Sequence, residues 1–351
     1  MRENYESLGA EFENKPEPEI NPDSDSKKNQ TEDGQEARTR HKFYFDKKTT
    51  AKVPELLSNE NVEKVEKGII NRRDILKDCF TKQDFIDLGL EEQSQETIEF
   101  INKYKNQIIK FANDRGVNVE KRFPDNEDIY FLNNEAIAGM SGRPGYDSPT
   151  GICSTNEVMV NKEKAADKYG ALLHELVHFA CKEKFFIFNN SRSKSTCKGY
   201  ALTGKNKYYK FFNEGLTETT KRQIYLENGE QALSLSYPPQ VIFVTELAKD
   251  LAQKMSKKEN KEVSQKDVLT HLQAGMFQSD RSYLGIIIDF YNKEAFKALM
   301  EMGKKEEDVI KVSKLFELSA VEEKINNYKD KKETKITIGD KDLLFYGDDR
   351  R

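Results

Sequence analysis

Two of the chain's four histidines lie four residues apart, at His174 and His178, with Glu175 next to the first. They fall in an apolar segment of helical periodicity, and positions i and i+4 of an α-helix lie one turn apart on the same face. Two imidazoles so placed can bind one Zn²⁺, and the intervening glutamate can act as general base on a water activated by the metal. The H-E-x-x-H pattern therefore predicts a metal site on a helix.

A catalytic zinc needs a third protein ligand and one open position for water. Glu214 lies in the first turn of another expected helix, far enough downstream for the chain to return to the site. Glu218 follows one turn later on the same face, where a carboxylate can hydrogen-bond the free nitrogen of a ligand histidine. Two alternatives stay open: Glu214 as a first-turn glutamate favoured by the helix dipole, with Glu218 or a more distant carboxylate as ligand, and a solvent-exposed Glu218.

The second segment reads Asn213-Glu214-Gly215-Leu216-Thr217-Glu218. Together with H-E-x-x-H it resembles the paired motifs of the gluzincin metallopeptidases, the thermolysin-like class, whose second motif has the form N-E-x-x-[ST]-[DE]. The resemblance extends over residues 95–230 and implies a peptidase with one Zn²⁺ per chain. It implies His174, His178 and Glu214 as zinc ligands, Glu175 as general base and Glu218 as the support of a ligand histidine.

In such a site the zinc lowers the pKa of its water to about 7 and polarises the scissile carbonyl. Glu175 would take the proton of the water and pass it to the leaving amine. A further donor must stabilise the tetrahedral oxyanion, and thermolysin-like enzymes use a histidine or tyrosine for this. Tyr208, Tyr200, His271 and Tyr237 are the candidates, and we single out Tyr208 and His271, although His271 also fits an ordinary helix histidine.

Simpler interpretations compete with an enzyme. The two histidines can share a buried helix by coincidence, or the zinc can be structural, with Glu175 an ordinary surface residue. The runner-up function is a catalytically inactive protein of the zincin fold that keeps the zinc site and serves binding or regulation. The presence of Glu175 favours an enzyme, because an inactive descendant has no chemical need for it.

The composition restricts the location of the chain. Its 351 residues include 34% charged side chains, and no apolar run approaches the ~20 residues of a membrane span. Because no basic segment followed by an apolar stretch opens the chain, we expect no secretory signal and a cytoplasmic location, with leaderless export as the alternative. The four cysteines have no C-x-x-C spacing, which favours free thiols; Cys79 is either a buried structural thiol or a cap on the zinc.

The net negative charge is concentrated in the first 40 residues, which hold eleven acidic and six basic side chains. Few apolar residues lie there, so we expect residues 1–40 to form a disordered acidic tail. The rest is near neutral, and its lysines alternate with glutamates, which argues against nucleic-acid binding. The expected partner is a peptide or protein substrate, and the oligomeric state does not follow from the sequence.

The expected fold class is α+β. We expect a zincin-like catalytic domain, with a small mixed sheet and the active-site helix above and a mainly α-helical lower subdomain below. By analogy with zincins, the segment 151–155 and the strand after it would bind extended peptide at a sheet edge; the alternative is a plain loop and strand. The predicted parts are the tail 1–40, a helical N-terminal extension 41–93, the upper subdomain with the metal site 94–230, the helical lower subdomain 231–330 and a C-terminal hairpin or tail 331–351.

Periodicity and capping residues predict the individual elements. A helix is expected over 98–112 with Gly116 at its C-terminal end, and the metal helix over 163–184. Strands are expected at 129–132 and 157–160, a loop at 139–151 and a hairpin or an ordered loop within 199–211. Further helices are expected near 240–256, 265–277 (with Ser264 as N-cap), 285–302 and 305–326, before a terminal hairpin.

Overall fold

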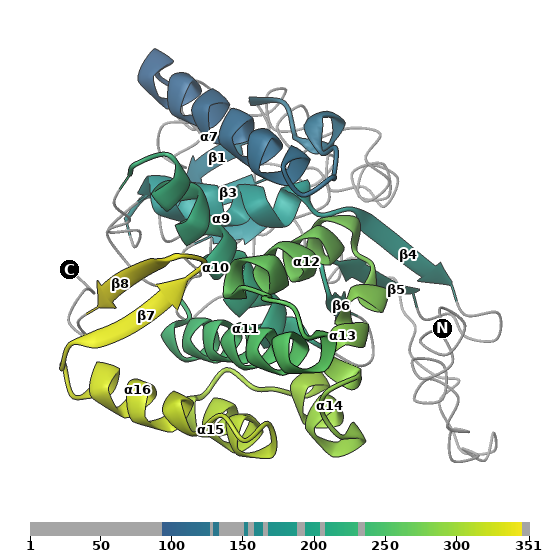
Figure 1. Cartoon of the computed structure of the whole chain (residues 1–351). Coiled ribbons are helices and arrows are strands. Elements are labelled where there is room, and N and C mark those ends of the chain that lie inside the picture. The colour runs from purple at the N-terminus through teal and green to yellow at the C-terminus, as the bar shows by residue number, and fades with distance from the viewer. Residues whose placement is uncertain are drawn as a thin grey trace, which may run out of the picture. The chain divides into compact units, whose positions relative to one another are not determined.

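The computed structural model describes residues 93–126, 129–132, 151–153, 158–163, 168–187, 194–203, 208–230 and 236–345 (Figure 1). The predicted tail 1–40, nearly all of the extension 41–93, Cys79 and most of the loop 139–151 lie outside these residues. The described residues form helices and small sheets, an α+β combination as predicted. The chain divides into two compact units, which are described separately: residues 1–94 with 124–165, and residues 95–123 with 166–351.

The described part of the first unit is a three-stranded sheet of order β1-β3-β2. β1 (Ile129–Leu132) pairs in parallel with β3 (Val158–Asn161), and β2 (Gly151–Cys153) pairs with β3 in antiparallel register. Every residue of β3 is buried, and the strand is paired on both edges. β1 and β3 correspond to the two predicted strands, whereas β2 was not predicted, because three residues beginning with glycine carry little strand signal.

The second unit holds the helices and the remaining strands. Its long helices are α7 (Gln95–Asn113), α9 (Lys168–Ala180), α10 (Lys210–Glu227), α11 (Pro238–Glu259), α12 (Gln265–Gln278), α14 (Lys293–Met300), α15 (Glu306–Leu315) and α16 (Ser319–Lys329). Shorter helical turns are η1 (Glu120–Arg122), η3 (Arg281–Leu284) and α13 (Gly285–Ile288). Strands β4 (Glu183–Ile187), β5 (Lys194–Lys198) and β6 (Ala201–Thr203) form one antiparallel sheet, and β7 (Thr334–Ile338) with β8 (Lys341–Phe345) forms the expected terminal hairpin.

Local signals in the sequence mark several helix ends correctly. The apolar positions that predicted α7 are buried: Ile101, Tyr104, Ile108, Phe111 and Ala112. Gly116 follows that helix at φ 74°, where a glycine lacks the Cβ penalty of other residues. Ser264 caps α12 in a reciprocal capping box with Asp267, each side chain accepting a hydrogen bond from the other's backbone N–H. The Ser264 cap is therefore confirmed.

The metal helix is shorter than predicted. It ends at Ala180, and the residues up to Lys184, which were expected to continue it, instead enter β4. The N–H of Cys181 bonds the carbonyl of His178 in a tight last turn, and the N–H of Lys182 donates to the carbonyl of Phe277 at the end of α12. This contact with a distant part of the chain draws the backbone out of the helix.

The predicted hairpin within 199–211 is present as β6 and a return bridge between Leu202 and Tyr208. Two predicted helices are each interrupted. In the first, the Asn292 side chain accepts a hydrogen bond from the N–H of Ala295 and so starts α14 afresh after η3 and α13. In the second, Glu317 at φ 58° separates α15 from α16. Both interruptions depend on one polar residue inside an otherwise helical pattern.

Helix α10 lies at the centre of the second unit and packs against α9 and α11. Every residue of α10 from Asn213 to Tyr225, except Glu214, is buried, including Glu218, Lys221 and Arg222. Buried polar side chains need partners, so they must form a network inside the unit. The predicted boundary at 230/231 separates α10 from α11, although these two helices pack directly together.

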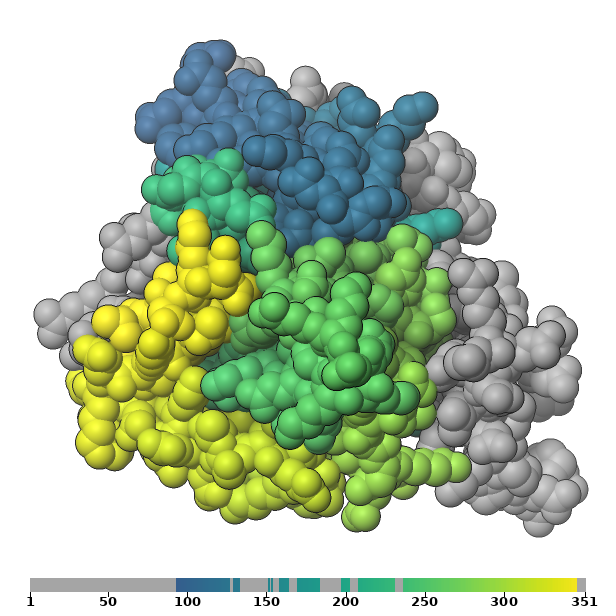
Figure 2. All heavy atoms as spheres, in the orientation of Figure 1, coloured from purple at the N-terminus to yellow at the C-terminus, as the bar shows by residue number. Residues whose placement is uncertain are grey.

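The C-terminal segments cover part of this core. In Figure 2 the yellow atoms of the C-terminal residues lie directly against the green atoms of the preceding helices, and β7 contacts α10, α11 and α16. Within the described ranges, every helix is too short or too polar to cross a membrane.

Candidate metal centre

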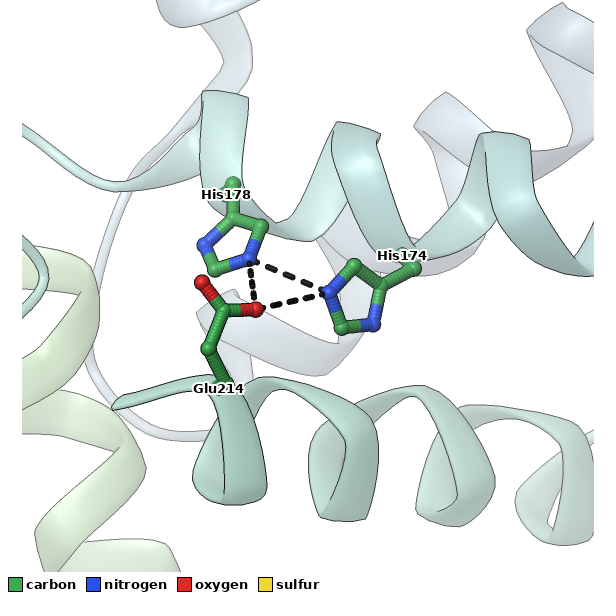
Figure 3. Close-up of side chains that lie close together, drawn as sticks. All are labelled: His174, His178 and Glu214. Carbon is green, nitrogen blue, oxygen red and sulfur yellow. Dashed lines mark hydrogen bonds and ion pairs between the residues drawn. The ribbon is translucent and has the colours of Figure 1, made fainter. Parts of the chain in front are cut away.

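Helix α9 presents His174 and His178 to the start of α10. The apolar residues of α9, among them Leu172, Leu173 and Leu176, are fully buried and fix the rotation of the helix. The two imidazoles therefore point the same way, with ring centroids 4.8 Å apart. Figure 3 shows both rings on one helix turned toward Glu214 on the facing helix.

Glu214 completes a three-residue cluster. Its Oε2 lies 3.2 Å from Nε2 of His174 and 3.1 Å from Nε2 of His178, and the two Nε2 atoms are 3.1 Å apart. These residues form the His-His-Glu group able to hold a metal among the residues that the structure describes. The cluster unites the residues that the two sequence motifs singled out.

The partners of the two Nδ1 atoms indicate which ring nitrogen of each histidine carries a proton. Nδ1 of His174 lies 3.0 Å from Oε2 of Glu218, and Nδ1 of His178 lies 3.4 Å from Oγ1 of Thr217. A carboxylate accepts hydrogen bonds, so Nδ1 of His174 carries the proton; the Thr217 hydroxyl can accept from His178 and donate to Sδ of Met276 at 3.7 Å. Both Nε2 lone pairs then face each other and a carboxylate oxygen.

Three converging lone pairs repel one another unless a proton or a metal ion lies between them. Tetrahedral bonds of about 2.0–2.1 Å to nitrogen or oxygen place neighbouring ligand atoms about 3.3 Å apart, close to the separations seen here. Two imidazoles and one carboxylate suit zinc, whereas magnesium and calcium prefer sites made of oxygen alone. The donor set and its spacing therefore fit a zinc ion with one coordination position left open.

Glu218 is held from both ends. Its side chain is fully buried, and while Oε2 faces His174, Oε1 lies 2.8 Å from Nζ of Lys221 and 3.3 Å from Nε of Arg222. The N–H of Ser236 donates a further hydrogen bond to the same oxygen over 3.2 Å. The alternative of a solvent-exposed Glu218 is therefore wrong, and the carboxylate fixes the orientation of the His174 ring.

The acidic surroundings favour a positive charge at the cluster. Burial opposes the protonated form of His174, but its hydrogen bonds to Glu214 and Glu218 raise its pKa to about 10. Burial also opposes the charged form of Glu218, yet Lys221 and the hydrogen bond to His174 lower its pKa to about 2. Despite its own burial, the neighbouring histidines hold the pKa of Glu214 well below its usual value. A proton thus takes the place of a cation in the metal-free protein.

Glu175 lies beside the cluster without being part of it. It is 9% exposed, and its charge interacts with those of His174, His178 and Glu214. Burial is the main reason that its pKa is raised, and the negative charge of Glu214 adds to the effect. A carboxylate that is buried yet able to gain and lose a proton has the property that a general base needs.

The structure places the two singled-out oxyanion candidates in different surroundings. His271 on α12 has Nε2 3.1 Å from the backbone carbonyl of Tyr283, and its ring lies against the Tyr283 ring. Tyr208 precedes α10 and forms the backbone bridge with Leu202. For both, the oxyanion role stays a prediction.

Three residues near the cluster were not singled out from the sequence. Thr217 lies three residues after Glu214 and therefore on the same helix face, so this spacing in the sequence could have indicated that Thr217 lies near the cluster. Lys221 and Arg222 follow Glu218 by three and four residues, the usual spacing of helical ion pairs. Their full burial could not be read from the sequence, because charged residues on a helix are mostly solvated.

Asn213 fixes the start of α10. Its Oδ1 accepts a hydrogen bond of 2.9 Å from the N–H of Tyr200. Gly199 has φ 61°, and a Cβ there would lie 2.2 Å from that Oδ1, so the close approach requires glycine. The asparagine of the second motif thus ties α10 to the segment between β5 and β6.

Zinc binding at neutral pH is expected to release about one proton. Because the pKa of His174 is raised to about 10 in the metal-free protein, its imidazole is protonated at pH 7 and must lose that proton to become a ligand. The apparent zinc affinity should therefore rise about tenfold per pH unit from pH 7 toward pH 10. Titration calorimetry in buffers of different ionisation enthalpy measures the release, and equal heats in all buffers would contradict it.

The comparisons with known proteins supply no relative: no family model matches the chain, and no match was found among curated proteins or among solved structures.

Proposed function

We propose that this chain is a zinc-dependent peptidase of the gluzincin type with a zincin-like fold. The observation that carries the proposal is the convergence of three potential ligand atoms, from His174, His178 and Glu214, at mutual distances of 3.1–3.2 Å. Glu175, a buried carboxylate beside the cluster that is not a ligand, would add the base that hydrolysis requires. A purely structural zinc is usually bound by four protein ligands, whereas this cluster supplies three.

When bound, the zinc ion would supply Lewis-acid activation of a water molecule and of the scissile carbonyl. Glu175 would accept the proton of the attacking water and later deliver it to the amine that leaves. Glu218 would hold the His174 ring, because its contact with Nδ1 leaves only Nε2 for the metal. Thr217 would do the same for His178 through an uncharged hydroxyl.

The substrate of this reaction would be a peptide or protein. β2 is the outer strand of the sheet order β1-β3-β2, and among the described residues no strand pairs with its second edge. An extended peptide can add to such an edge through backbone hydrogen bonds. The cytoplasm remains the expected location.

Metal analysis followed by a cleavage screen tests the proposal. The purified full chain, after mild dialysis, should contain about one zinc, and the zinc-loaded protein should cleave members of a mixed peptide library with new amino termini visible by mass spectrometry. A chain that binds no zinc even after reconstitution would refute the metal site. Stoichiometric zinc without cleavage of any peptide would instead favour the inactive binding protein.

A further inference from the structure

The backbone of Tyr237 is held in an unfavourable conformation beside the metal cluster. It lies at φ 53° and ψ 48°, in the left-handed region, where a bulky side chain is rarely found. The next residue is Pro238, and a residue before proline ordinarily prefers extended backbone. Such a conformation persists only where the surrounding contacts impose it, and such residues gather at functional sites.

The contacts that impose it come from both sides. The N–H of Ser236 is bonded to Oε1 of Glu218, the carboxylate that also holds His174. The carbonyl of Tyr237 accepts the N–H of Val241 and so begins α11. The position of Tyr237 is therefore tied to the same buried group that orients a proposed zinc ligand.

The side chain of Tyr237 reaches the cluster. Its ring stacks on the His174 ring, with centroids 5.9 Å apart and an angle of 23° between the planes. Its hydroxyl lies near the Glu214 carboxylate, toward which a phenol can act only as donor, and within electrostatic range of Glu175; burial and both carboxylates raise the pKa of Tyr237. The Tyr237 side chain thus lies beside two of the three cluster residues, and its hydroxyl lies near the candidate base.

Two of the other candidates, Tyr200 and His271, have their polar atoms engaged elsewhere. The hydroxyl of Tyr200 donates to the carbonyl of Leu272, and the Tyr200 side chain is fully buried. His271 uses Nε2 on the carbonyl of Tyr283. Tyr237 is half-buried, whereas Tyr200 is fully buried.

We propose that Tyr237 is a catalytic residue that donates a hydrogen bond to the substrate oxygen on which negative charge develops. This inference rests on the proposed function. As the water oxygen bonds to the carbonyl carbon, the carbonyl π electrons move to the oxygen, and the phenol directs its hydrogen to that oxygen without transferring it. The C–N bond then breaks, the carbonyl re-forms, and the amine nitrogen receives the proton that Glu175 carried.

The Tyr237→Phe variant tests the role, and Tyr291→Phe is its matched control. Tyr291 also donates its hydroxyl to a carboxylate, that of Asp250 on α11, and has no contact with the cluster. Four quantities should be measured on the zinc-loaded full chain. They are the zinc content, kcat and KM for a peptide that the wild-type protein cleaves, and the Kd of an N-phosphoryl dipeptide. The tetrahedral phosphorus of that dipeptide mimics the hydrated carbonyl.

In Tyr237→Phe we expect unchanged zinc content, a fall in kcat of about 10²–10³-fold with little change in KM, and a phosphoryl dipeptide bound about 10–100-fold more weakly. Tyr291→Phe should match the wild type in all four. A Tyr237→Phe variant with wild-type kcat and wild-type affinity for the phosphoryl dipeptide would overturn the inference and leave the proposed function intact. Loss of zinc from that variant would also overturn it, since the hydroxyl would then serve the ligands rather than the substrate.

Discussion

Replacing Glu175 by glutamine should lower kcat by about 10²–10⁴-fold while the chain still binds about one zinc. Glutamine has the shape of glutamate, but its amide cannot accept the proton of a water molecule. Glu175 contributes no atom to the three-residue cluster, so the affinity for zinc should change little. Because burial already disfavours the Glu175 carboxylate, a neutral amide adds no cost of burial and the fold should be retained.

A suitable control is Glu246→Gln on α11. Glu246 is buried to a similar degree, 7% exposed against 9% for Glu175, and it is paired with Lys324 rather than with the cluster. The kinetics of peptide cleavage and the zinc content of both variants measure the contrast. Undiminished hydrolysis by the Glu175→Gln variant would remove this residue from the mechanism.

The two histidines of the cluster were predictable because their relation is local. Four residues along one helix place His174 and His178 on the same face whatever surrounds them. Glu214 followed from a second motif, and the structure brings it within 3.2 Å of both rings. Ser264 likewise caps its helix through a partner three residues away. Features that depend on residues close together in the sequence were therefore predicted correctly.

Features set by distant contacts were not predictable. The end of α9 depends on a hydrogen bond from the N–H of Lys182 to the carbonyl of Phe277, and no sequence pattern near Ala180 predicts this bond. The conformation of Tyr237 depends on Ser236 and Glu218, and the following proline would have suggested extended backbone instead. The choice of Tyr208 and His271 as oxyanion donors stays a prediction, because the four candidates differ only in their three-dimensional surroundings.

Replacing Glu214 by alanine should lower the affinity for zinc by about 10²–10³-fold, because a binding free energy of roughly 10–16 kcal/mol is shared among three or four ligands. The matched control is Glu227→Ala on the same helix, which removes a carboxylate paired with Arg115 and leaves the cluster intact. Zinc affinity is measured by competition with a chelator of known strength, and circular dichroism verifies that both variants keep their helices.

Stoichiometric, tightly bound zinc in Glu214→Ala would mean that another carboxylate is the third ligand, and the sequence offered Glu218 for that role. The structure makes this substitution costly. One oxygen of Glu218 faces Nδ1 of His174, and the other faces Lys221, Arg222 and the N–H of Ser236. Turning the carboxylate toward Nε2 would leave two buried cations without it and release the ring that it orients. The expected loss of zinc therefore follows from the contacts of Glu218 as much as from those of Glu214.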